Sequence, residues 1–469
     1  MSFEKEMKEE CGVFGVVSHP EASRMAYLGL YGLQHRGQES AGIATSDGKK
    51  LHIYKGMGYV ADVFDKSRLE KLSGDSAIGH VRYSTAGDSS FANAQPILVD
   101  TWRGPIALAH NGNILNAAHL RHEMEWDGAI FNSTSDSEVI LHLISRSKRR
   151  NFTEALVDAL QIIRGAYSLL ILTPEFLIAA RDPYGFRPLC LGSLKGRYVV
   201  ASETCALDLI EAEYAREIEP GEIIRIQGDS IESVMPLPKS KPAHCVFEHV
   251  YFSRPDSVVF GRTVTTSRKL LGKNLAREHP VDADVVVPVP DSGVVAALGY
   301  SEESGIPLEF GLIRNHYVGR TFIEPKQSIR NFGVKVKLNP VRDILRGKRV
   351  VLVDDSIVRG TTSRKIVQMV RSAEASEIHV RLTSPPIIAP CYYGIDTPTK
   401  GELIAANKSV DEIRKYIGAD SLEYLSLEKL LESVADKNSF CSACFTDRYP
   451  TEVIHEERQK ELFGKKSSC

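Results

Sequence analysis

The chain has 469 residues, of which 43% are hydrophobic and 25% charged, with a formal net charge of −2. At roughly 150 residues per domain this length predicts two or three domains of ordinary globular composition. The small net charge argues against a nucleic-acid or membrane partner. No run approaches the ~20 apolar residues of a membrane span, and the charged N-terminal decapeptide lacks the apolar core of a secretory signal. We therefore expect a cytoplasmic protein, in which eight scattered cysteines serve packing, catalysis or metal binding.

Short strand-like runs separated by turns dominate residues 11–234, and residues 135–150 form a helical pattern. Strands and helices without regular βαβ spacing predict a layered α+β domain. A polar, proline-bearing stretch at residues 235–243 predicts a linker.

The pattern changes after the linker. Residues 283–290 and 348–355 are continuous apolar runs of strand length, and each leads through a loop into a helical segment. Strands without alternation are buried on both faces, so residues 244–445 are predicted to form an α/β domain with a parallel sheet. Residues 446–469 are predicted to be a charged C-terminal tail.

Cys11 directly follows the acidic decapeptide. If residues 1–10 are a propeptide, their removal gives Cys11 a free α-amine beside its thiol. An α-amine with a pKa of ~7.7–8.0 is a general base near neutral pH and activates the thiol without a histidine. A cysteine in this context is otherwise a small buried hydrophobic residue, so its role depends on the motifs that follow.

Four segments follow Cys11 in order: LQHRGQESAG, GHVRYSTAG, AHNGNI and STSDSEVI. Together they closely resemble the glutaminase domain of the N-terminal-nucleophile amidotransferases. The resemblance implies a layered αββα domain, glutamine binding by Arg82 and Asp136, and an oxyanion hole made by Asn111 and Gly112. These residue types suit the chemistry, because the zwitterionic substrate needs a guanidinium and a carboxylate, and its tetrahedral intermediate needs hydrogen-bond donors. Singly, they would be read as a surface charge, a helix cap and a turn.

A second motif occupies residues 348–367, KRVVLVDDSIVRGTTSRKIV. A buried strand ends in Asp354 and Asp355, and a loop then opens a helix. A helix N-terminus binds phosphate, and adjacent acids bind ribose hydroxyls or a hard cation such as Mg²⁺. No Walker motif is present. The segment strongly resembles the phosphoribosyl-pyrophosphate motif of type I phosphoribosyltransferases, which implies a 5′-phosphate site made by Ser356, Arg359, Gly360, Thr361, Thr362 and Ser363.

Two more segments extend this prediction. The turn PVPDSG, residues 288–293, ends the other buried strand, and the resemblance makes it a pyrophosphate loop with Ser292 near the Mg²⁺ of Asp354 and Asp355. Residues 314–342 are rich in Arg and Lys and lack a helical period, which is typical of a lid or a disordered segment. A basic lid would stabilise departing pyrophosphate and exclude water, and Arg320 and Lys337 match basic positions of the family's flexible loop.

The two motif sets together, from Cys11 to about Phe445, resemble the glutamine phosphoribosylpyrophosphate amidotransferase family. The resemblance implies that ammonia released from glutamine displaces pyrophosphate from phosphoribosyl pyrophosphate to give phosphoribosylamine, the first committed step of purine biosynthesis. It also implies a homo-oligomer, a tetramer in this family, with purine nucleotides as feedback inhibitors.

Four cysteines form a third constellation. Cys441 and Cys444 make a C-x-x-C, while Cys245 and Cys391 are distant in sequence. Four thiolates suit either Zn²⁺ or an iron–sulfur cluster, and a C-x-x-C alone does not decide between them. One branch of the family carries a structural [4Fe–4S] cluster and a short propeptide, and the resemblance implies that branch here. We expect Cys190 and Cys205 to be core residues and assign no role to Cys469.

Three alternatives are weaker. A phosphoribosyl-pyrophosphate-sensing repressor needs a DNA-binding module with a basic helix, and no such pattern is found in the sequence. A salvage phosphoribosyltransferase has no use for Cys11 and its glutamine motifs. A hexosamine-forming amidotransferase shares the first domain but carries sugar-isomerase domains in place of the motif at residues 348–367.

Overall fold

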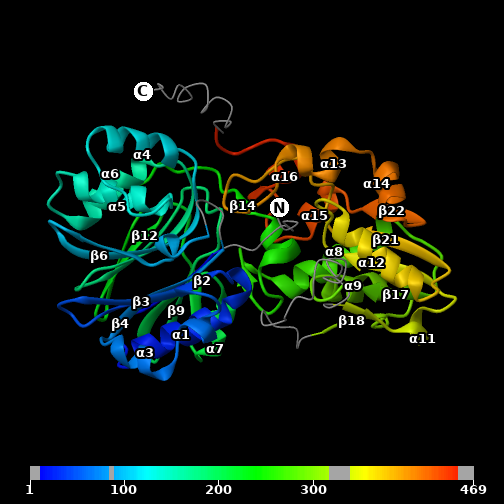
Figure 1. Ribbon diagram of the computed structural model, residues 1–469, viewed down its shortest axis with the longest axis horizontal. Coiled ribbons are helices and arrows are strands. Elements are labelled where there is room, and N and C mark those ends of the chain that lie inside the picture. The colour runs from blue at the N-terminus through cyan, green and yellow to red at the C-terminus, as the bar shows by residue number, and fades with distance from the viewer. Residues whose placement is uncertain (1–10, 84–88, 316–337, 453–469) are drawn as a thin grey trace, which may run out of the picture.

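The computed structural model describes residues 11–83, 89–315 and 338–452. Two lobes follow one another along the chain (Figure 1). The first lobe runs from β1 (Gly12–Val16) to β13 (Ser230–Val234), and the second from β14 (His244–Cys245) to α16 (Ala443–Thr446). Residues 235–243 between them contain neither helix nor strand.

The first lobe is a sandwich of two sheets, with seven strands in the order β11-β9-β10-β1-β4-β2-β3 and six in the order β13-β12-β8-β7-β6-β5. Every hydrogen-bonded pair of these strands is antiparallel. The remaining strands are β2 (Ser40–Ser46), β3 (Leu51–Met57), β4 (Ser76–Arg82), β5 (Ile97–Thr101), β6 (Gly104–Ile114), β7 (Gly165–Leu172), β8 (Leu177–Arg181), β9 (Cys190–Leu194), β10 (Arg197–Ala201), β11 (Glu213–Glu217) and β12 (Ile223–Gln227).

Helices cover both outer faces of the sandwich, on opposite sides in Figure 1. One group shares a buried cluster with the seven-stranded sheet, and the other shares a cluster with the six-stranded sheet. The first group is α1 (Ala22–Gly32), α2 (Val60–Val63), α3 (Lys66–Lys71) and α7 (Thr204–Leu209), and the second is α4 (Ala117–Trp126), α5 (Ser137–Arg146) and α6 (Phe152–Ile162). The short helical turns are η1 (Gln34–Arg36) and η2 (Phe91–Asn93).

The inner faces of the two sheets share a core of their own, to which Val13 and Ile78 contribute from one sheet and Ala107 and Leu170 from the other. β7 shows the consequence, because all eight of its residues are buried. A sheet covered by a second sheet on one face and by helices on the other has no solvated side, so an antiparallel strand there is buried along its whole length. The αββα arrangement predicted for this lobe is confirmed.

The second lobe is built on a four-stranded sheet in the order β17-β20-β21-β22, and all its pairs are parallel. The predicted parallel sheet is therefore confirmed, although only two of its strands were expected from sequence. Its strands are β17 (Val285–Pro288), β20 (Arg349–Asp354), β21 (Glu377–Leu382) and β22 (Ser421–Tyr424). Its helices are α8 (Val264–Glu278), α9 (Val294–Ser304), α11 (Arg342–Leu345), α12 (Thr361–Ser372), η5 (Lys400–Glu402), α13 (Ile404–Asn407), α14 (Val410–Ile417) and α15 (Leu427–Glu432).

Small strand pairs complete the second lobe. β14 pairs in parallel with β23 (Phe440–Cys441), so the last structured part of the chain returns to the first residues of the lobe. β15 (Val258–Val259) pairs with β16 (Arg262–Thr263). β18 (Leu312–Arg314) and β19 (Leu338–Pro340) are antiparallel partners, so the two ends of the basic segment 314–342 lie side by side.

Candidate active sites

Cys11 immediately precedes β1, which pairs with β4 in the register Gly12 opposite Val81. One position further along the same pairing, Cys11 lies beside Arg82, the last residue of β4. Both side chains are buried, with 6% of Cys11 and 2% of Arg82 exposed. Arg82 is therefore not a solvated surface charge, and its Nη1 lies 3.9 Å from Oε2 of Glu39.

Asn111 and Gly112 lie within β6, which contacts β1 across the sandwich. The NGN sequence is therefore not a turn, because β6 continues to Ile114 with β7 as its partner. Gly112 has φ 151°, and a Cβ at this position would lie 2.1 Å from the carbonyl oxygen of Ala166. Only glycine fits this conformation and this close approach.

The side chain of Asn111 is only 1% exposed, and its Nδ2 has no hydrogen-bond partner in the described part of the chain. An unpaired buried amide nitrogen costs about 1–3 kcal/mol. Native proteins satisfy nearly all such groups, so this nitrogen is available to a ligand.

Asp136 occupies the N-cap position of α5 but does not cap the helix. Its Oδ2 instead accepts a hydrogen bond of 2.8 Å from the backbone N–H of Ile114. The hydroxyl of Ser137 donates to its Oδ1 at 3.3 Å. This carboxylate is thereby held against β6, the strand that carries Asn111.

In the second lobe, β17 and β20 are parallel neighbours, so their carboxyl ends meet at one edge of the sheet. β20 ends at Asp354 and Asp355 follows. The loop after β17 stays close to β20, because the N–H of Val289 donates to the carbonyl of Val353 at 2.8 Å. Ser292, in this loop, and the two acids therefore lie at the same sheet edge, where ligands of open α/β sheets bind.

The loop after β20 leads into α12, whose N-cap is Gly360 with φ 76°. A Cβ here would lie 2.9 Å from Cδ1 of Ile404, so backbone and space both favour glycine. The hydroxyl of Ser356 donates to Asp355 at 2.5 Å. The hydroxyl residues Thr361, Thr362 and Ser363 form the first turn of α12.

Arg359 already has a partner on one side, because its Nη2 donates to Oε1 of Glu402 at 2.7 Å. Its Nη1 is buried and has no hydrogen-bond partner among the described residues. One end of this guanidinium is thus held by a carboxylate and the other end is not. Arg320 and Lys337 lie outside the described residues, as do residues 1–10 and 453–469.

Cys245, Cys391, Cys441 and Cys444 line one cavity, together with aromatic and aliphatic side chains such as Phe186. Cys245 lies opposite Cys441 in the β14–β23 pair. Burial raises the pKa of the Cys441 thiol to about 12 and that of Cys444 well above its ordinary value. Thiols in such apolar surroundings remain neutral unless a metal stabilises the thiolate.

The four thiols share one cavity. A tetrahedral Zn²⁺ with bonds of ~2.3 Å would draw four sulfurs to within about 4 Å of one another. In the described part of the chain, no three Cys, His, Asp or Glu side chains form a group that could hold a metal ion.

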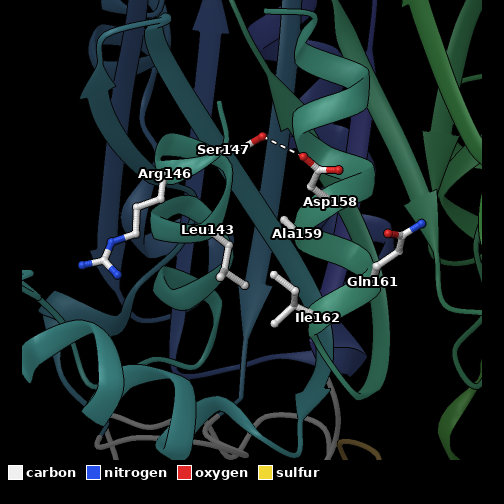
Figure 2. Close-up of a pocket in the computed structure, with 7 residues that line it drawn as sticks. All are labelled: Leu143, Arg146, Ser147, Asp158, Ala159, Gln161 and Ile162. Carbon is white, nitrogen blue, oxygen red and sulfur yellow. Dashed lines mark hydrogen bonds between the residues drawn. The ribbon is translucent and has the colours of Figure 1, made fainter. Parts of the chain in front are cut away.

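Another hollow lies on the outer helical layer of the first lobe, between α5 and α6 (Figure 2). A hydrogen bond of 2.9 Å from Ser147 to Asp158 crosses it. None of the residues predicted to act lines it: its lining is Leu143, Arg146, Ser147, Asp158, Ala159, Gln161 and Ile162.

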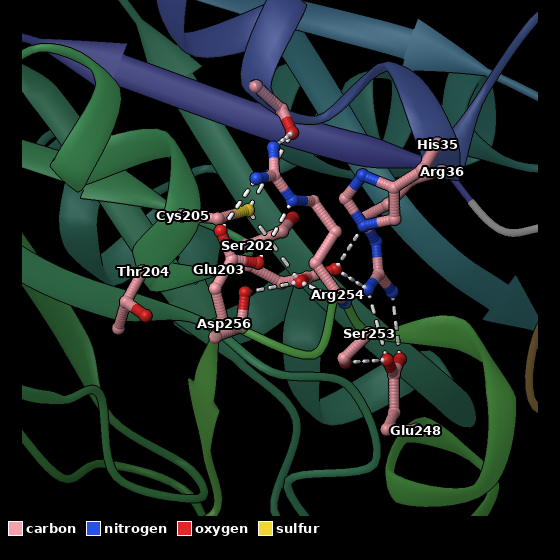
Figure 3. Close-up of polar contacts among 12 residues, drawn as sticks. His35, Arg36, Ser202, Glu203, Thr204, Cys205, Glu248, Ser253, Arg254 and Asp256 are labelled. Atoms are coloured by element: carbon pink, nitrogen blue, oxygen red, sulfur yellow. Dashed lines mark hydrogen bonds and ion pairs between the residues drawn. The ribbon is translucent and has the colours of Figure 1, made fainter. Parts of the chain in front are cut away.

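The contacts between the lobes were not predicted from sequence. Asn113, next to the Asn111–Gly112 pair, donates to the carbonyl of Tyr392 at 2.9 Å. A buried cluster of charges, drawn in Figure 3, joins Arg36 and Glu203 of the first lobe to Glu248 of the second. Arg36 lies inside a quoted motif, but the motif gives no indication of partners 167 and 212 residues away.

Comparison with known proteins fits this two-lobed arrangement. Residues 80–209 match the glutamine amidotransferase domain family, and residues 267–383 match the phosphoribosyl transferase domain family. The chloroplastic amidophosphoribosyltransferase 2 of Arabidopsis thaliana is 56% identical over 97% of this chain and 82% of its own length. The amidophosphoribosyltransferase of Methanocaldococcus jannaschii is 53% identical over 95% and 99% of the two chains.

The chain belongs to the amidophosphoribosyltransferase family. It is accordingly an enzyme of the first step of purine biosynthesis, in which ammonia from glutamine is transferred to phosphoribosyl pyrophosphate to give phosphoribosylamine, glutamate and pyrophosphate.

Solved structures agree with this membership. The glutamine phosphoribosylpyrophosphate amidotransferase of Bacillus subtilis, complexed with ADP and GMP, superposes with a TM-score of 0.91 at 51% identity, covering 95% of this chain and 98% of its own. A structure described as the allosteric regulatory enzyme of purine biosynthesis gives 0.92 at the same identity, covering 95% and 97%. No described helix of this chain has the length and apolar character of a membrane span.

Proposed function

We propose that glutamine is hydrolysed at Cys11, after residues 1–10 have been removed as a propeptide. The α-amine of Cys11 takes the thiol proton, and Sγ attacks the carboxamide carbon of glutamine. Collapse of the tetrahedral intermediate breaks the C–N bond, and the leaving nitrogen takes the proton from the amine and departs as ammonia. Water then cleaves the thioester, which releases glutamate and restores the thiol.

Asn111 carries this proposal, because its buried Nδ2 lacks a partner among the described residues. Nδ2 and the backbone N–H of Gly112 would donate to the oxygen that becomes negative in the intermediate. Arg82 would bind the α-carboxylate of glutamine and Asp136 its α-ammonium group. Both are buried or held in place before substrate arrives, which lowers the cost of ordering the site.

Phosphoribosyl pyrophosphate would bind at the carboxyl edge of the β17–β20 pair. Asp354 and Asp355 would accept hydrogen bonds from the ribose hydroxyls, and the loop from Ser356 to the first turn of α12 would hold the 5′-phosphate, with Arg359 contributing its unpaired Nη1. Ammonia attacks C1 of the ribose as the bond to pyrophosphate breaks. Ser292, Asp354 and Asp355 would hold a Mg²⁺, which supplies positive charge against the pyrophosphate. Arg320 and Lys337 would add charge from the basic segment.

The four cysteines would hold a [4Fe–4S] cluster, Cys245, Cys391, Cys441 and Cys444 each supplying one thiolate. Support comes from the apolar cavity that all four cysteines line. The cluster would supply structural cross-linking, because its proposed ligands lie on β14, on or just after β23 and in the segment around Cys391.

The wider organisation is also proposed. Residues 11–234 would form the glutaminase domain, 235–243 the linker, 244–445 the transferase domain and 446–469 a tail. The Bacillus subtilis structure is complexed with ADP and GMP, and purine nucleotides would likewise bind this enzyme, as feedback inhibitors. The family resemblance further implies a homo-oligomer, a tetramer. A reducing cytoplasm would suit its eight cysteines.

Replacing Asn111 by Ala tests the glutaminase proposal. Loss of one oxyanion donor lowers kcat by about 10²–10³, so glutamine-dependent pyrophosphate release should fall by that factor while ammonia-dependent release is retained. Asn116→Ala is the matched control, because Asn116 is a buried asparagine whose Nδ2 donates to the carbonyl of Ile162 and whose Oδ1 accepts from Arg164. Equal losses in both variants would remove Asn111 from the oxyanion hole.

Iron and sulfide analysis of protein purified without oxygen tests the cluster, and about four of each per chain are expected. Zinc in their place would refute the cluster while keeping the cross-link. Intact-mass measurement of active enzyme tests the propeptide, because Cys11 should be the first residue; full glutamine-dependent activity with Met1 attached would contradict it.

A further inference from the structure

Arg36 lies at the centre of a buried charge cluster between the lobes (Figure 3). Its Nη1 is 2.5 Å from Oε1 of Glu203, and its Nη2 is 2.8 Å from Oε1 of Glu248. The three side chains are at most 1% exposed. Glu203 precedes α7 of the first lobe, whereas Glu248 begins η3 (Glu248–Phe252), a π-helical turn of the second lobe.

The third nitrogen of the same guanidinium points to the nucleophile. Nε of Arg36 donates to the backbone carbonyl of Cys11 at 3.1 Å. A guanidinium is planar and rigid, so two carboxylates that fix its Nη atoms also fix the direction of Nε. The peptide group that Nε holds is attached to the Cα of Cys11, which carries both the thiol and, after removal of residues 1–10, the amine.

We propose that Glu248, a residue of the second lobe, positions the nucleophile of the first lobe by holding Arg36. The proposal rests on the role proposed above for Cys11. Glu248 touches neither glutamine nor the reacting atoms in this scheme, so it is a positioning residue. The glutaminase site is then completed by a carboxylate from the transferase lobe.

Glu248 is itself held firmly. The hydroxyl of Ser253 donates to its Oε2 at 2.5 Å, and Nη1 of Arg187 lies 3.4 Å from its Oε1. The buried Arg268 donates to three backbone carbonyls at the turn, those of His249, Tyr251 and Ser253, at 2.7–3.0 Å. The turn therefore presents a fixed carboxylate to Arg36, which is what accurate placement of a catalytic group requires.

The other carboxylate is fixed from both lobes. Ser257 and the backbone N–H of Arg254 donate to Oε2 of Glu203 at 2.6 and 2.9 Å. Burial opposes ionisation of Glu203, but the charges of His35 and Arg36 and these hydrogen bonds outweigh it, so the pKa of Glu203 lies below its ordinary value. Arg36 thus lies between two carboxyl groups whose positions depend on the interface.

Glu248→Gln is the main test, since it keeps the side-chain size and removes the charge. Misplacement of a reacting group by about 1 Å costs up to ~10² in rate. We therefore expect kcat for glutamine hydrolysis to fall about 10- to 100-fold, with the KM for glutamine changed less than about 3-fold because Arg82 and Asp136 are untouched. Ammonia-dependent transfer should stay within about 2-fold of the parent enzyme, and Glu248→Asp should recover part of the loss.

Glu222→Gln is the matched control. Glu222 is also a buried carboxylate, paired with Arg216 at 2.7 Å and Ser233 at 2.6 Å within the first lobe. It should lower stability without the selective loss of kcat. Equal losses of the two activities in Glu248→Gln, or the same kinetic pattern in Glu222→Gln, would make Glu248 a structural residue only.

A second variant applies if Glu248→Gln does not fold. Arg36→Lys keeps the charge but has no Nε to hold the Cys11 carbonyl, and it should show the same selective loss of kcat; an unchanged kcat in folded Arg36→Lys enzyme would overturn the inference. Failure of the underlying proposal is separate, because it would appear as glutamine hydrolysis by Cys11→Ala enzyme.

Discussion

Cys11 and Cys190 are both buried thiols of the seven-stranded sheet region, 6% and 3% exposed, but their surroundings differ. Burial raises the pKa of Cys190 far above its ordinary value, which makes that thiol inert. Sγ of Cys11 lies 3.5 Å from the carbonyl oxygen of Tyr83, and its own carbonyl is held by Arg36. These polar contacts fit the role proposed above for Cys11.

Cys11→Ala should therefore separate the two half-reactions. Without the thiol no thioester forms, so glutamine hydrolysis should be abolished, while ammonia-dependent pyrophosphate release should continue at the second site. Parallel assays with glutamine and with ammonium salts check this. Cys190→Ala, which removes a core thiol at a modest packing cost, should keep both activities, and loss of both in folded Cys11→Ala enzyme would contradict the two-site scheme.

Several residue positions followed from sequence and others did not. The quoted motifs lie on neighbouring strands: Arg82 ends β4, which pairs with β1 next to Cys11, and Asn111 and Gly112 lie in β6, which contacts β1 across the sandwich. The capping pattern at Asp136 was misleading taken alone, since its carboxylate bonds to β6 instead of its own helix. Glu248 carried no local signal, because its meaning depends on a partner 212 residues away.

At the scale of elements, α12 combines a buried face with an N-terminus at the edge of the sheet. Ile366, Val367, Met369 and Val370 are buried, the i, i+1, i+3, i+4 spacing that covers a sheet. Its N-terminus follows Gly360 in the left-handed conformation and faces the carboxyl edge of the sheet. The helix thus needs a glycine where its first turn would meet a phosphate.

Gly360→Ala should lower stability by about 1–2 kcal/mol for the left-handed backbone and raise the KM for phosphoribosyl pyrophosphate about 10-fold by displacing the loop. Gly305→Ala is the matched control: Gly305 ends α9 with φ 75°, and a Cβ there meets nothing within 4 Å. It should lose similar stability and keep its KM. Urea unfolding and initial rates measure the two effects, and equal KM values in both variants would remove Gly360 from the phosphate site.

The parallel sheet shows which strands could be predicted from the sequence and which could not. β17 and β20 were predicted because their apolar runs are unbroken. β21 was not, because it contains His379 and Arg381, and β22 is only four residues long. Both polar side chains are nonetheless buried, and Arg381 is satisfied by the carbonyl of His279 and the hydroxyl of Ser421. Only tertiary partners make that strand possible.

At the scale of the whole molecule, buried histidines should make the fold sensitive to acid. Burial lowers the pKa of His80 and of His249 to about 3, and that of His244 to about 4. The unfolded chain takes up these protons near pH 6.5, so the free energy of unfolding falls as pH decreases below 6.5. Each such histidine costs about 2 kcal/mol at pH 5. Asp182, whose pKa burial raises to about 6, acts in the opposite direction but offsets only about 1 kcal/mol over that range.

The free energy of unfolding, measured in urea, should therefore decrease when the pH is lowered from 7 to 5. In the His80→Gln enzyme this decrease should be smaller by about 2 kcal/mol. His119→Gln, at a half-exposed helix position, is the control and should behave as the parent. A pH dependence identical in all three proteins would show that His80 is not a buried neutral residue.

The pairing of β14 with β23 has a consequence for the order of events during biosynthesis. Cys245 and Cys441 are opposite one another in that pair, and 441 − 245 = 196 residues separate them. At about 5–20 residues per second, a ribosome needs on the order of 10–40 s to travel between them. The first lobe therefore emerges well before the strand that closes the second one. The β14–β23 pair, and with it the cavity that Cys245 and Cys441 share, can therefore form only after nearly the whole chain has been synthesised.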